Sequence, residues 1–245
     1  MTKSEFFSFE KEDLDFPFYK SNDLSLVEWI VLTLSFVITG ILICIPPTLY
    51  PGFLNFLVQY KGFLYFLIPF LGILFASKGK LDSICKKLSL KDGKLIVILL
   101  VLSAIYSVAM GLILRLAFNI IPNANPVFNE TPTLLFWIQF FFQLFGEELI
   151  ILIPFLIVLF LVYKFSQNRK LGIIIGVLVS LFIFGILHFN AYHSFISIIM
   201  IQGVGSIIRM YGYLKTKNIL VTYLIHVLFD LMFIIPGILF LIHFL

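Results

Sequence analysis

Two adjacent glutamates, Glu147 and Glu148, lie in the middle of the apolar run from Thr133 to Tyr163. A carboxylate in hydrocarbon is unstable by several kcal/mol, so an acid inside a membrane span indicates a functional site. Between Thr131 and Leu245 the only acids are these two and Asp230, and all three lie in apolar runs. The acids of this half are therefore confined to the segments where an ionised side chain is least stable, which points to a chemical purpose.

Two histidines lie in later apolar runs and are candidates for the same site. His188 ends the run from Leu171 to Phe189, and His226 lies in a later run with Asp230 one turn further on. A His and an Asp four residues apart share a helix face and form a natural hydrogen-bonded pair. At about 1.5 Å of rise per residue, Glu147 and His188 reach similar depths, whereas His226 meets them only if its helix starts deeper or tilts.

The chemistry that these groups allow is hydrolysis. A glutamate can take a proton from water as general base, a histidine can orient that water, and a second histidine with a polar partner can stabilise an oxyanion. Two histidines and a glutamate are also a zinc-ligand set, although the chain has no HExxH motif. A polar seam between helices is the structural alternative, and it explains Gln139 and Gln143, on the same face as Glu147, better than it explains two adjacent glutamates.

The elements that must position these residues are membrane helices. The chain is 61% hydrophobic and 12% charged, with 30 Phe among 245 residues, whereas a soluble domain is about 25% charged. Runs of about 20 apolar residues recur along its whole length. We therefore expect an all-α polytopic bundle of about seven to eight transmembrane helices. The expected spans are Ser25–Ile45, Gly62–Ala76, Leu95–Phe118, Leu134–Tyr163, Leu171–Phe189, Phe195–Tyr213 and Ile219–Ile235, with a half-helix or frayed end at Gly237–Leu245.

The expected domain organisation is one transmembrane domain over residues 25–245, after an N-terminal cytoplasmic tail over residues 1–24. This tail is acidic and lacks the basic start and apolar core of a signal peptide. We expect it to be interfacial or disordered, with its phenylalanines in contact with lipid.

The distribution of Lys and Arg predicts the topology. Basic residues gather in the loops 77–94, 164–170 and 215–217, whereas the alternate loops 46–51 and 119–132 carry none. The positive-inside rule then places the N-terminus and the basic loops in the cytoplasm of a multi-pass cell-membrane protein. A composition rich in Lys, Asn, Ile and Phe suggests a bacterial source. The net charge of +4 is explained by these loops and does not imply nucleic acid.

Three motifs, in this order and all in membrane helices, resemble the signature of the CPBP family. This family comprises the CAAX-prenyl-protease and bacteriocin-processing intramembrane proteases, also called the Abi family. The motifs are Glu147-Glu148, Phe184-x-x-x-His188 and His226-x-x-x-Asp230. The resemblance covers about residues 134–235, the protease-like core, and the first half of the chain matches only as generic spans.

The resemblance implies a role for each residue. Glu147 would activate water, with His188 as its partner, while His226 and Asp230 would stabilise the oxyanion and Glu148 would support the site. It also implies hydrolysis of a peptide bond within a membrane cavity, without a cofactor. Family members act near the C-terminus of lipidated proteins in eukaryotes, and bacterial members are often tied to bacteriocin immunity or peptide maturation.

One departure from the family pattern matters. The first motif is usually Glu-Glu-x-x-x-Arg, and here the position of the arginine holds Leu152. Arg209 is the basic residue deep in a later span, and we expect its guanidinium to face the bundle interior within about 4 Å of Glu147 or Glu148.

The sequence therefore predicts an intramembrane endopeptidase whose substrate is a small peptide or a membrane-anchored protein in the lipid bilayer. Two alternatives stay open. One is a non-catalytic immunity or scaffold protein of the same fold, which the absent arginine favours. The other is a small proton-coupled transporter, against which the chain shows no inverted repeat and no paired broken helices.

Overall fold

A computed structural model describes residues 5–20, 23–45, 59–121, 132–192 and 194–243, together with residues 49, 52 and 57. Side chains are described as far as residue 235. The expected all-α polytopic bundle is confirmed. Its main helices are α1 (Leu26–Cys44), α3 (Lys61–Ala76), α4 (Leu90–Phe118), α5 (Leu134–Ser166), α6 (Arg169–Leu187), α7 (Phe189–Tyr192), α8 (Phe195–Ser197), α9 (Ile207–Thr216) and α10 (Ile219–His243).

The helices are long and apolar enough for a membrane protein. Among the described residues, five segments meet the length and composition of a membrane span, namely α1, α4, α5, α6 and Phe195–Thr216. Two shorter apolar helices, α3 and Ile219–Ile235, complete the set. The expected half-helix at Gly237–Leu245 is not a separate element, because α10 continues through Gly237 to His243. Most of the loops expected at 46–51 and 119–132 lies outside the described residues.

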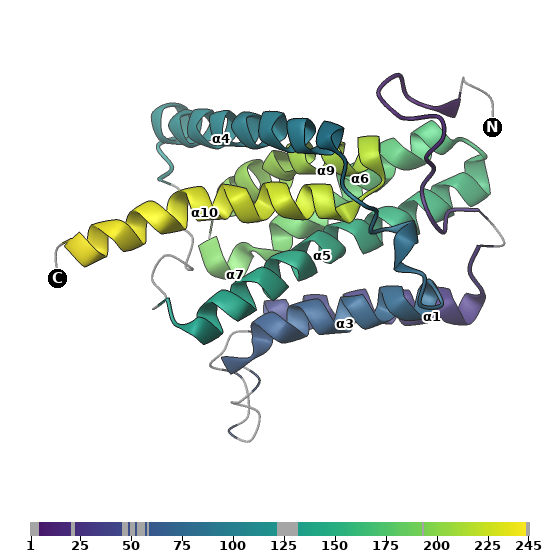
Figure 1. Ribbon diagram of the computed structural model, residues 1–245, viewed down its shortest axis with the longest axis horizontal. Coiled ribbons are helices and arrows are strands. Elements are labelled where there is room, and N and C mark those ends of the chain that lie inside the picture. The colour runs from purple at the N-terminus through teal and green to yellow at the C-terminus, as the bar shows by residue number, and fades with distance from the viewer. Residues whose placement is uncertain are drawn as a thin grey trace.

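The hairpin of α5 and α6 forms the centre of the bundle, with α1 and α3 on one side and α4, α9 and α10 on the other (Figure 1). Glycines on α6 allow the close approach. A Cβ at Gly172 would lie 3.2 Å from the carbonyl oxygen of Leu159, and a Cβ at Gly176 would lie 3.1 Å from that of Phe155. Small residues at membrane-helix interfaces let two backbones approach in this way. Every residue of α5 from Glu148 to Leu156 is buried, so the first motif lies next to the packed core.

The span expected at Phe195–Tyr213 is not one regular α-helix. Helix α8 is followed by a π-helix (Ile198–Gly203), a 3₁₀ turn (Val204–Ser206) and α9. The π-helical backbone runs against α6, because a Cβ at Gly203 would lie 3.0 Å from the carbonyl oxygen of Leu181. Short π-helical segments are frequent at functional sites, and this one is separated by only the 3₁₀ turn from the helix that carries Arg209.

Helix α10 begins partway along α5 rather than at the end of the α5–α6 hairpin (Figure 1). Ile219, its first residue, lines a pocket together with Ile151 and Leu152, and α5 continues from there for about four turns to Ser166. The deeper start of α10 brings His226 to the level of the glutamates.

The α5–α6 hairpin extends beyond the turn between α9 and α10. Residues 5–20 pack against the surface that this extension leaves beside the turn. The ring of Phe16 lies 5.2 Å from that of Phe155 and 6.0 Å from that of Tyr213, and the ring of Tyr19 lies 5.0 Å from that of Tyr163. Phe6, Phe16, Phe18 and Tyr19 are buried. This segment therefore differs from the interfacial or disordered tail that the sequence predicted, because its aromatic side chains have protein surface to pack against.

A close backbone contact between α5 and α3 predicts a sensitive position. A Cβ at Gly146 would lie 2.4 Å from the carbonyl oxygen of Tyr65 and 2.8 Å from the backbone nitrogen of Phe66, both in α3. Gly146→Ala is expected to lower the free energy of unfolding by about 1–3 kcal/mol, because the obstructing atoms are backbone and α3 must shift. Thermal unfolding of the detergent-solubilised protein measures the effect. Gly111→Ala is the control, since a Cβ there meets nothing within 4 Å; equal melting temperatures for the two variants would contradict the prediction.

Candidate active site

Glu147 lies between the two histidines of the later motifs. Its Oε2 is 3.8 Å from Nε2 of His188 and 3.8 Å from Nε2 of His226. The other carboxylate oxygen, Oε1, accepts a hydrogen bond of 3.0 Å from Nε2 of Gln143, one turn earlier on α5. Three side chains from α5, α10 and the residue after α6 therefore converge on one point.

The hydrogen bonds of the two imidazoles decide which nitrogen faces Glu147. Nδ1 of His188 lies 2.8 Å from the carbonyl oxygen of Phe184, and Nδ1 of His226 lies 2.8 Å from Oε1 of Glu148. Both partners are acceptors, so each Nδ1 carries its proton, and in a neutral ring Nε2 is then an acceptor. The two Nε2 atoms and the Glu147 carboxylate therefore surround a position suited to a small proton donor such as water.

Glu148 is the more deeply buried of the two glutamates. Its side chain is 4% exposed, compared with 14% for Glu147. Besides His226, it is paired with Arg209, whose Nη1 lies 3.5 Å from Oε1. The ion pair that we expected between Arg209 and one of the glutamates is present.

Arg209 is held in place by residues that precede it in the same segment. Its Nη2 donates a hydrogen bond of 2.7 Å to Oγ of Ser206, which in turn donates one of 2.6 Å to the carbonyl oxygen of Gln202 in the π-helix. The guanidinium also lies 5.7 Å from the centre of the Phe184 ring. Arg209 thus reaches Glu148 from α9, whereas the family pattern expects the arginine on α5.

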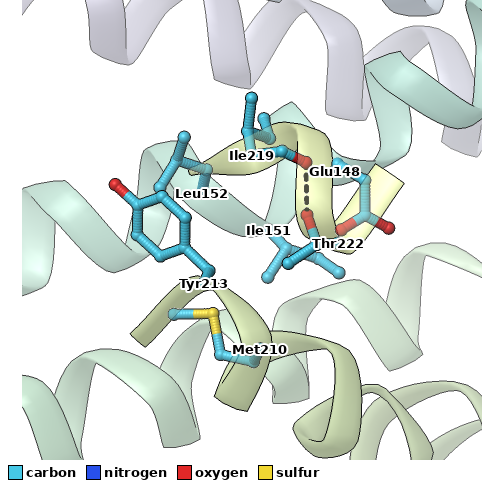
Figure 2. Close-up of a pocket in the computed structure, with 7 residues that line it drawn as sticks. All are labelled: Glu148, Ile151, Leu152, Met210, Tyr213, Ile219 and Thr222. Carbon is cyan, nitrogen blue, oxygen red and sulfur yellow. Dashed lines mark hydrogen bonds between the residues drawn. The ribbon is translucent and has the colours of Figure 1, made fainter. Parts of the chain in front are cut away.

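The position of the family arginine holds Leu152, which lies among both apolar and polar side chains. Figure 2 shows it lining one pocket with Glu148, Tyr213 and Thr222, in which Thr222 of α10 lies beside Glu148. The Leu152 side chain is buried. Arg209 supplies from another helix the positive charge that the family places at this position.

Asp230 follows His226 on α10, but the expected hydrogen bond between them is absent among the described residues. Both nitrogens of His226 are directed to glutamates instead, because α5 brings Glu148 to Nδ1 and Glu147 towards Nε2. Asp230 is half-buried and lies within electrostatic range of His226 and Glu147.

Two histidines and a glutamate are also a zinc-ligand set. Within the described ranges, no group of three His, Cys, Asp or Glu side chains has the arrangement that would hold a metal ion.

The sequence analysis missed the buried role of two basic residues. Arg169 and Lys217 counted only as loop charges that set the topology, yet their side chains are 1% and 0% exposed. Both contact Glu10 in the N-terminal segment. Only the abundance of acids in residues 5–15 pointed to partners of opposite charge, and no local pattern identifies which lysine or arginine they meet.

The pairing of Arg209 with Glu148 can be measured. Arg209→Met is expected to lower the free energy of unfolding by about 3 kcal/mol, because it leaves a buried carboxylate without its cation. Glu148→Gln in the same background should recover much of this loss, which gives a coupling energy in a double-mutant cycle of thermal unfolding. Arg115→Met, an exposed arginine of α4, is the control. Additive effects of the two substitutions would show that the charges do not interact.

Comparison with known proteins agrees with this geometry. Residues 129–232 match the family model described as type II CAAX prenyl endopeptidase Rce1-like. No curated protein and no solved structure matches the chain. The matched range contains both glutamates, His188, His226, Asp230 and Arg209 and leaves out α1, α3 and α4. The match confirms the resemblance to the CPBP family, and the part of the chain that builds this site is similar to a family of type II CAAX prenyl endopeptidases.

Proposed function

We propose that this protein is an intramembrane endopeptidase that hydrolyses a peptide bond with a water activated by Glu147. The observation that carries the proposal is the equal distance of 3.8 Å from Oε2 of Glu147 to Nε2 of His188 and of His226. This separation is too long for a direct hydrogen bond, and a water between the groups can bond to both sides. The family match supports the reaction class.

The first step is the attack of this water on the scissile carbonyl carbon. Glu147 takes one proton of the water as general base, while Nε2 of His188 accepts a hydrogen bond from it and fixes its orientation. The hydrogen bond from Nδ1 of His188 to Phe184 holds the ring in the tautomer that this role needs. Gln143 binds the other oxygen of Glu147 and keeps the carboxylate turned towards the histidines.

The second step is the breakdown of the tetrahedral intermediate. His226, whose Nδ1 is bonded to Glu148, stabilises the oxyanion when its Nε2 carries a proton. Asp230 is the second candidate for oxyanion stabilisation, for which its carboxyl must carry a proton. The proton held by Glu147 then passes to the leaving nitrogen as the C–N bond breaks, so the base is restored.

The substrate class that fits this site is a peptide or a protein anchored in the lipid bilayer. Glu147 lies in a helix that is long and apolar enough to cross a membrane, so a substrate that reaches it would have to enter the bilayer. A role in the cell membrane with the basic loops cytoplasmic, and in bacteriocin immunity or peptide maturation, is part of the same proposal.

Three variants test the mechanism. Glu147→Gln, His188→Ala and His226→Ala are each expected to lower kcat by about 10²-fold or more, because each removes a base, a water ligand or an oxyanion donor. The protein is reconstituted in liposomes with a farnesylated CAAX-type peptide and with unmodified membrane peptides, and the released fragments are measured by mass spectrometry. Arg115→Met controls for expression and insertion. Full activity in all three variants would exclude this site, and a folded wild type without any cleavage would favour the non-catalytic scaffold.

The metal dependence separates the water mechanism from the zinc alternative. Cleavage is expected to continue after treatment with a chelator, and the purified protein should hold much less than one zinc per chain by elemental analysis. A stoichiometric zinc that is lost together with activity would instead assign both histidines as ligands.

A further inference from the structure

A second group of buried charges, outside the candidate active site, joins the N-terminal segment to two helix ends. Glu10 accepts hydrogen bonds of 2.9 and 2.8 Å from Nη1 and Nη2 of Arg169, and another from Nζ of Lys217. Arg169 is the first residue of α6, and Lys217 lies in the turn between α9 and α10. The side chains of all three are at most 1% exposed. Glu10 therefore links the start of α6 to the turn before α10, two places that are distant in the sequence.

The guanidinium of Arg169 is fully enclosed by the N-terminal segment. Oδ1 of Asp15 accepts hydrogen bonds of 3.2 Å from both Nε and Nη2, and the carbonyl oxygen of Glu5 accepts one of 3.2 Å from Nη1. The rings of Phe6 and Phe16 cover its faces, with centroids 4.4 and 4.9 Å away. These bonds give residues 5–20 a defined position on the bundle.

Lys217 is equally enclosed and gives the turn before α10 its anchor. Its Nζ lies 3.7 Å from the centre of the Phe16 ring and also donates to the carbonyl oxygen of Leu214. The residue adopts a left-handed conformation with φ of 51°, which directs the chain from α9 into α10. Burial raises the pKa of Glu10, but hydrogen bonds from Arg169 and Lys217 outweigh burial and hold the pKa at about 2. The carboxylate is therefore ionised at neutral pH.

The next two residues fasten the start of α10 to the loop after α3. Asn218 accepts a hydrogen bond of 3.0 Å from the backbone nitrogen of Lys86 and donates one of 2.9 Å to its carbonyl oxygen. The backbone nitrogen of Ile219 donates one of 2.8 Å to Ile84. The depth at which α10 begins is thus set by contacts with two segments that precede the matched family region.

His226 lies seven residues after Ile219 on the same helix, or about 10 Å along its axis. A shift of the α9–α10 turn therefore moves His226 relative to Glu147, because a hydrogen-bonded helix transmits axial displacement over two turns. We infer that Glu10 is a positioning residue: by bridging Arg169 and Lys217, it sets the depth of α10 and so aligns His226 with Glu147. The inference rests on the proposed function for its effect on catalysis, but not for its effect on α10.

The catalytic test uses Glu10→Gln in the full chain, reconstituted in liposomes with the same peptide probes. We expect kcat to fall by at least about tenfold with KM changed less than about twofold, since a displacement near 1 Å is enough for a large loss of rate. Asp13→Asn removes an exposed carboxylate from the same segment and is the matched control, with kcat as in the wild type. Unchanged kcat in Glu10→Gln would overturn the inference, as would a loss confined to thermal stability.

A second variant guards against loss of folding. Glu10→Asp keeps the charge but shortens the side chain by one methylene, so it cannot span Arg169 and Lys217 in the same geometry. We expect a folded protein with kcat lowered by an intermediate factor, between those of the wild type and Glu10→Gln. Wild-type kcat in Glu10→Asp would show that the bridge geometry does not matter and would refute the positioning role.

Hydrogen exchange provides a readout that does not need peptidase activity. In Glu10→Gln, backbone amides of residues 219–226 are expected to exchange at least about tenfold faster than in the wild type, while those of residues 176–184 in α6 keep their protection. This pattern supports the anchoring of α10 even if no probe peptide is cleaved, which would count against the proposed function alone. Equal exchange in residues 219–226 of both proteins would refute the inference whatever the activity.

Discussion

The instability of unpaired charge in hydrocarbon is the constraint on which the rest of this structure depends. Glu148 is almost completely buried, and it is stable there because Arg209 of α9 and His226 of α10 both meet the same carboxylate oxygen. A single acid on α5 therefore fixes the rotation of two further helices. The same rotation directs Nε2 of His226 towards Glu147, so the compensation of Glu148 also places the histidine beside the neighbouring glutamate.

The same constraint acts a second time where the helices begin. Arg169 and Lys217 are buried, and Glu10 with Asp15 neutralises them from a segment distant in sequence. Helix α10 is thus held at its start through Lys217 and two turns later through His226. One ionic contact in the turn before α10 and one within the helix leave little freedom in its depth, which keeps His226 3.8 Å from the Glu147 carboxylate.

Glu148 needs a positive charge beside it, but in this protein that charge does not come from the position where the family usually has it. The family pattern expects an arginine one turn after Glu148, where this chain has the buried Leu152. The positive charge comes instead from α9, steadied by Ser206 and reached through a π-helical segment. Compensation of Glu148 is therefore a property of the bundle, and it can be supplied by any helix whose geometry brings a guanidinium to that carboxylate.

The apolar periodicity of the sequence was enough to predict an all-helical membrane bundle, because length and hydropathy alone define a span. Acids are rare in those spans because an ionised carboxylate is unstable in hydrocarbon, and this rarity identified Glu147, Glu148 and Asp230 as candidate site residues. Only the tertiary structure could decide that His226 bonds Glu148 rather than Asp230, since neighbours on one helix compete with partners from another that no local pattern reveals. The tertiary structure also decided that residues 5–20 pack against the bundle. An acidic, aromatic segment packs in this way only where it meets buried cations, which here are Arg169 and Lys217.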